Sequence, residues 1–236
     1  MSKLRVAVCA LLLWAGIGVA GPVTDFEKSL RDAYGDYRVA LFLTNSGKLP
    51  ESVKFIAAFK DKWAGLEKNW GTNPPPQYAD DPKWKETLDE VSATLAKAAA
   101  EIDDGALPAA HTTLEDIREA ISGLHQRNGI ISFSDRMNAY HAVMEEVLEK
   151  DLSKLDSVAM DEMQERAAVL KYLANDAITH PPMDAAGSTE FDGLGKAVSA
   201  SVDAVVIAAR TGNTEKLKIA VGKLKPAYAK LFLRFG

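Results

Sequence analysis

The strongest constraint on the fold is the spacing of the apolar residues, which repeats every three to four positions over long stretches of the chain. This spacing places the apolar side chains on one face of an α-helix. Residues 53–70, 84–102 and 107–124 follow it throughout, and period-two alternation typical of strands is missing from the sequence. The stripe of residues 84–102 consists of Trp84, Leu88, Val91, Leu95, Ala98 and Ile102. The sequence therefore predicts an all-α fold.

Two proline-rich stretches interrupt the helical pattern, at residues 71–82 and 179–190. Proline lacks a backbone N–H and restricts the residue before it, so we expect helices to end at both stretches. Pro226 lies inside the last apolar stripe and predicts a kink or break in the final helix.

An internal repeat emerges when the chain is aligned on Gly47, Gly105 and Gly212. Each glycine separates two apolar stripes, and glycine suits the left-handed residue that often ends a helix. Each copy therefore predicts an αα-hairpin. The apolar residues in register are Ile56, Phe59, Trp63 and Leu66, then Leu114, Ile117, Ile121 and Leu124, then Val221, Leu224, Tyr228 and Leu231.

These hairpins predict about eight helices that form one or two units resembling four-helix bundles. The first unit is an N-terminal αα-hairpin over residues 21–70. Residues 83–178 are expected to form a central four-helix bundle, and residues 188–236 a C-terminal αα-hairpin. Short connections favour antiparallel neighbours, so helices that follow each other should pack together.

Residues 1–20 have the features of a secretory signal peptide. Lys3 and Arg5 precede an apolar run, and small residues end at Ala20, after which we expect cleavage. Cys9 is the single cysteine and lies within this segment, so the mature chain has no disulfide and no thiolate ligand. An exported chain without cysteine fits the bacterial periplasm, which is the predicted location.

The charge of the chain excludes one broad class of partner. Loss of Lys3 and Arg5 with the leader moves the formal net charge from −5 to −7. Such an acidic chain is a poor nucleic-acid binder, because phosphate contacts need clustered Lys and Arg. The mature chain has no second apolar stretch long enough to span a bilayer. Signatures of hydrolases, metalloproteases, P-loop and dinucleotide-binding enzymes are also missing from the sequence, so no catalytic residue is predicted.

A histidine stands four residues before a glutamate twice, as His111 with Glu115 and His141 with Glu145. Side chains four apart lie on one helix face, with Cβ atoms about 5–6 Å apart. The helices expected over 111–126 and 134–150 should be antiparallel neighbours, which brings the two pairs together. Nitrogen and carboxylate ligands without thiolate suit iron, manganese, zinc or nickel. We therefore predict a transition-metal site made by these four residues, in a periplasmic binding protein.

The repeat supports this prediction. His141 falls within the apolar stripe of its helix and should point inward, with Glu145 at the edge. His111 and Glu115 belong to the middle copy of the repeat, and the scaffold does not need polar residues there. The equivalent residues in the other two copies are Val53 and Lys218 for the histidine, and Ala57 and Gly222 for the glutamate.

Two other interpretations remain open. Glu115 and Arg118 would pair with each other on a solvated flank, and His141 would be a hydrogen-bonded core histidine. The protein would then be a cofactor-free interaction module with a partner in the cell envelope. Alternatively, His141 and a methionine would bind haem non-covalently, since the sequence has no C-x-x-C-H motif, or would bind copper. The methionines in reach are Met137, Met144, Met160 and Met163, whereas His125 and His180 are expected on the surface near loops.

The signal peptide, the helical hairpins and the glycine turn, which reads "GALPAA" at Gly105, resemble exported bacterial four-helix-bundle proteins such as those of the cytochrome c-prime type. The resemblance implies the fold type and the periplasmic compartment. The haem-attachment motif of those cytochromes is missing from this chain, so no functional residue is carried over.

Overall fold

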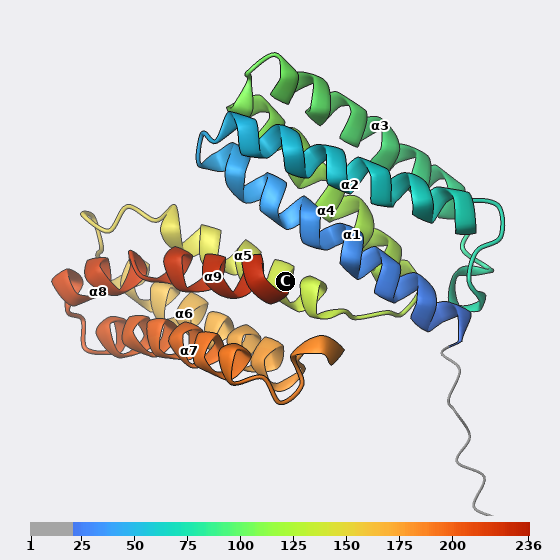
Figure 1. Cartoon of the computed structure of the whole chain (residues 1–236). Helices are drawn as coiled ribbons and strands as arrows, with labels where there is room; N and C mark the ends of the chain where they lie inside the picture. Colours follow the sequence, from blue (N-terminus) through green and yellow to red (C-terminus); the bar gives the residue numbers. More distant parts are fainter. Residues whose placement is uncertain (1–20) are drawn as a thin grey trace, which may run out of the picture.

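The computed structural model describes residues 21–236, and the predicted signal peptide lies outside this range. Residues 21–236 form nine α-helices and two short 3-10 helices, with no strand among them (Figure 1). The all-α prediction is confirmed. None of the helices in this described part is long and apolar enough to cross a membrane.

The helices divide into two groups on either side of the short linker 128–132. The first group ends with a helix that carries His111 and Glu115, and the second begins with one that carries His141 and Glu145. The elements are α1 (Pro22–Asn45), α2 (Leu49–Trp70), η1 (Pro76–Tyr78), α3 (Trp84–Asp103), α4 (Leu107–Arg127), α5 (Phe133–Leu148), α6 (Ser157–Thr179), η2 (Met183–Ala185), α7 (Thr189–Arg210), α8 (Thr214–Val221) and α9 (Leu224–Phe235).

Each group closes into its own four-helix bundle. In the first, α1 packs on α2, α2 on α3, α3 on α4, and α4 returns to α1. In the second, α5 packs on α6, α6 on α7, α7 on α9, and α9 returns to α5 (Figure 1). A proline-rich crossover with one 3-10 helix joins the second and third helix of each bundle. The two halves of the chain therefore repeat one architecture.

This grouping corrects the predicted division of the chain. The central bundle expected over residues 83–178 does not form, because α3 and α4 pack on α1 and α2, while α5 and α6 pack on α7 and α9. The expected terminal hairpins over residues 21–70 and 188–236 exist, and each supplies half of one bundle. The physical reason is that every helix carries a similar apolar stripe. Consecutive helices on the same side of the linker 128–132 therefore bury their stripes against each other.

The glycine turns of the repeat are confirmed. Gly47, Gly105 and Gly212 have φ values of 68°, 75° and 63°, which is the left-handed region. At the second turn the N–H of Ala106 donates to the carbonyl of Glu101 at 2.8 Å, which closes the end of α3. A side chain at such a position would strain the backbone, which explains why glycine is present at each turn.

The predicted break in the last helix is also confirmed. Residues 222 and 223 form a turn, so the expected eighth helix is divided into α8 and α9. Pro226 lies in the first turn of α9, where a missing N–H costs no intrahelical hydrogen bond. The break places α9 against α5 and α7, and also against α1 of the other bundle.

The two bundles meet along α1 and α9 and are fixed at the linker by His125. Its imidazole Nδ1 lies 2.8 Å from a carboxylate oxygen of Asp135, and its Nε2 lies 3.5 Å from one of Glu27. Asp135 also accepts the N–H of Ser132 at 2.8 Å and thereby caps α5. This group ties α1, α4 and the start of α5 together.

Candidate functional site

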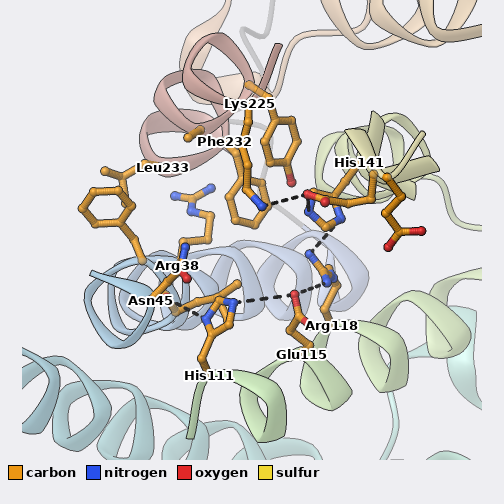
Figure 2. A pocket seen from close by; sticks show the side chains of 15 residues that line it. Arg38, Asn45, His111, Glu115, Arg118, His141, Lys225, Phe232 and Leu233 are labelled. Atoms are coloured by element: carbon orange, nitrogen blue, oxygen red, sulfur yellow. Dashed lines mark hydrogen bonds and ion pairs between the residues drawn. The ribbon is translucent and has the colours of Figure 1, made fainter. Parts of the chain in front are cut away.

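A cavity of about 400 Å³ lies where the two bundles meet, lined by side chains of α1, α4, α5 and α9 (Figure 2). All four residues of the predicted metal site, His111, Glu115, His141 and Glu145, line it. The two histidine–glutamate pairs therefore face one cavity. They reach it from separate bundles, because α4 and α5 do not pack along their lengths as expected.

His111 lies on the α4 side of the cavity. Its Nδ1 is 3.1 Å from the carbonyl oxygen of Leu41 and 3.5 Å from the hydroxyl of Thr44, both on α1. A carbonyl oxygen only accepts, so Nδ1 carries the proton and Nε2 faces the cavity. This Nε2 is 3.9 Å from Oε1 of Glu115, one helical turn further along α4.

His141 faces the cavity from α5. Its Nε2 is 3.2 Å from Oε1 of Glu145, and Lys225 Nζ on α9 is 3.0 Å from the same oxygen. The ring also lies against Tyr228, with the two ring centroids 5.1 Å apart. Burial, followed by the neighbouring Arg118 guanidinium, lowers the pKa of His141 to about 4, so the imidazole is neutral at neutral pH.

Arg118 lies between the two histidine–glutamate pairs. Its Nη2 donates to Oε1 of Glu115 at 3.0 Å, and its Nη1 is 3.5 Å from Nδ1 of His141 (Figure 2). The four predicted ligands therefore do not converge on one point. In the described range 21–236, no group of three or more His, Cys, Asp or Glu side chains is arranged to hold a metal ion. The sequence pattern suggested that Arg118 pairs with Glu115 but gave Arg118 no role in the predicted metal site.

Arg38 on α1 is the residue that sequence reasoning missed. Its side chain is almost fully buried, at 7% exposure, and lines the cavity. Neither Nε nor Nη1 has a hydrogen-bond partner. The signal was present in the sequence, since Arg38 continues the buried stripe of Leu30, Tyr34 and Leu41. A charged residue within an apolar stripe is rare unless something pairs with it.

The remaining wall of the cavity is largely apolar. Leu41 and Phe42 from α1 face Phe232 and Leu233 from α9. Phe232 stacks on Tyr228, with ring centroids 5.4 Å apart. The cavity thus combines charged groups from all four helices with an apolar surface on α1 and α9, a mixture typical of small-molecule sites.

The two other histidines and the methionines considered for haem or copper lie outside the cavity. His125 was expected on the surface, but it is 3% exposed and forms the linker contact with Asp135 and Glu27. That prediction is wrong, because Glu27 of α1 and Asp135 at the start of α5 enclose the imidazole. His180 is exposed, as expected. The methionines proposed for haem or copper do not line the cavity, and three lie fully buried in the core, namely Met137, Met144 and Met163.

No known protein family, characterised protein or solved structure matches this chain. The resemblance to cytochrome c-prime-type bundles therefore stays a prediction that rests on the sequence.

Proposed function

We propose that this protein is an exported binding protein that holds a small molecule in the cavity between its two bundles. The main observation behind this proposal is the cavity itself, which has a volume of about 400 Å³. It is lined by side chains from α1 and α4 of the first bundle and from α5 and α9 of the second. Its size falls within the range of roughly 300–1,000 Å³ that is common for ligand sites.

Buried polar atoms without partners support this proposal. The Tyr228 hydroxyl and two guanidinium nitrogens of Arg38 are buried around the cavity and form no hydrogen bond within residues 21–236. Burying a polar group without a partner is costly, so folded proteins rarely retain several in one place. A ligand that drew these side chains toward the cavity would supply the missing partners.

A variant that fills the cavity tests the proposal. Ala229→Phe puts a ring into the space, since Ala229 lines it, and should abolish ligand binding while leaving the fold intact. The matched control is Ala57→Phe, which changes an exposed position of α2. Binding would be followed by saturation-transfer NMR on the purified protein with a panel of small acids, amines and neutral compounds. Equal binding by Ala229→Phe and wild type would refute the proposed site.

A transition-metal ion is the second candidate ligand. The observation that favours it is the neutral imidazole of His141 beside Glu145, since a metal ligand must be unprotonated. Arg118 opposes it, because a cation would have to displace that guanidinium from between the pairs. Metal analysis after incubation with zinc, iron or copper tests it. One bound ion in wild type and none in His141→Ala, with His180→Ala as the control, is the expected result, and no stoichiometric metal in wild type refutes it.

A further inference from the structure

Two charged residues that line the cavity form no ion pair within residues 21–236, namely the buried Arg38 and the exposed Glu149. Arg118 pairs with Glu115 at 3.0 Å, and Lys225 pairs with Glu145 at 3.0 Å. Arg38 forms no ion pair and no hydrogen bond with any part of the chain between residues 21 and 236, although 93% of it is buried. Water can solvate the exposed Glu149, whereas Arg38 is a buried cation without a direct partner.

Arg38 keeps that charge at neutral pH. Burial, together with the nearby Arg31, lowers its pKa to about 10, which is still well above neutrality. A buried ion without a partner is unfavourable, because water no longer solvates it. Arg38 would therefore gain more from an incoming anion than would Arg118 or Lys225, which already contact carboxylates.

The surroundings of Arg38 restrict the chemistry of the anion. Figure 2 shows its side chain pointing from α1 toward the wall that carries Phe232 and Leu233, so an anion there would have apolar neighbours. Glu115 and Glu145 already have cationic partners, but the unpaired Glu149, which also lines the cavity, would repel a ligand with a second negative charge. The site therefore suits a singly charged anion with an apolar body.

We propose that the ligand is a small monocarboxylic acid whose carboxylate pairs with Arg38 and whose apolar part lies against Phe232 and Leu233. This inference rests on the proposed binding function and names the ligand class. The planar guanidinium matches a carboxylate through two parallel hydrogen bonds, a geometry that lysine cannot offer. Arg38 would thus bind the carboxylate, and Glu149 would disfavour dianions.

The test compares acids with their neutral amides by isothermal titration calorimetry. The probes are hexanoate and phenylacetate, hexanamide and phenylacetamide, and inorganic phosphate. Wild type should bind the acids at least tenfold more tightly than the amides and should bind phosphate less well than either acid. Arg38→Met should lose this preference and keep the affinity for amides. Its Tm should equal or exceed that of wild type, because the substitution removes an unpaired buried charge.

Lys28→Met is the matched control, because Lys28 is an exposed cation of the same helix and forms no ion pair within residues 21–236. It should bind like wild type. Equal affinity of wild type for acids and amides would overturn the carboxylate inference and leave the binding function standing. Tight phosphate binding would overturn the monocarboxylate class. Failure of every probe to bind would overturn the monocarboxylate class and leave other ligands open, whereas unchanged acid binding in Ala229→Phe would remove the proposed site as well. If Arg38→Met fails to fold, Arg38→Gln and the wild-type comparison of acid with amide decide the question.

Discussion

Replacement of His125 by glutamine should remove a pH-dependent contribution to the stability of the fold. The imidazole is buried between the carboxylates of Asp135 and Glu27, at 2.8 Å and 3.5 Å. Burial alone would lower its pKa, but the two carboxylates outweigh burial and raise it from 6.5 to about 9. The folded protein therefore binds this proton more tightly than the unfolded chain does.

The magnitude follows from the difference between the two pKa values. Each pKa unit corresponds to about 1.4 kcal/mol, so the charged imidazole contributes about 3 kcal/mol to the free energy of unfolding. This contribution is complete below pH 6.5 and is lost as the pH rises to about 9, because the folded state then releases the proton. His125 also lowers the pKa of Asp135, so protonation of that carboxyl removes the contact again in acid.

Urea unfolding of wild type and His125→Gln at several pH values measures this effect. The difference in free energy of unfolding should be largest near pH 6 and should shrink by about 3 kcal/mol between pH 6 and pH 9. The control is His180→Gln, which changes an exposed histidine and should give only a small difference in the free energy of unfolding. A His125→Gln difference that stays constant from pH 6 to pH 9 would refute the assignment of a charged imidazole at the linker.

Four further substitutions test the fold by chemical denaturation. Gly105→Ala should lower the free energy of unfolding by about 1–2 kcal/mol, because φ is 75° at this residue. Gly193→Ala, in helix α7 with open space around its Cβ, should raise it by about 0.5–1 kcal/mol. A change of the same sign at both sites would contradict the turn geometry. Tyr37→Phe removes a buried hydrogen bond to the carbonyl of Leu114 at 2.9 Å and should cost about 1–3 kcal/mol. Ser132→Ala removes the cap of α5 and should cost about 1 kcal/mol, and no loss of stability would argue against the capping box.

The sequence alone was sufficient for the features that depend on short-range physics. Apolar spacing determines which segments are helical, because a stripe forms within one helix and needs no knowledge of its neighbours. Gly105 and Pro226 act through their own backbone preferences, so the turn and the break could be predicted at those positions. The spacing of His111 with Glu115, and of His141 with Glu145, likewise fixed which side chains share a helix face.

Tertiary structure alone decided which helices close a bundle and what lies across the cavity. All the apolar stripes are similar, so the sequence could not show that α4 pairs with α1 and α5 with α9. That pairing buries His125 against Glu27, and it brings Arg38 to the site from a helix more than seventy residues before His111. The unmatched charge of Arg38 is likewise a property of the packed structure, because a missing partner can be recognised only when every neighbour is in place.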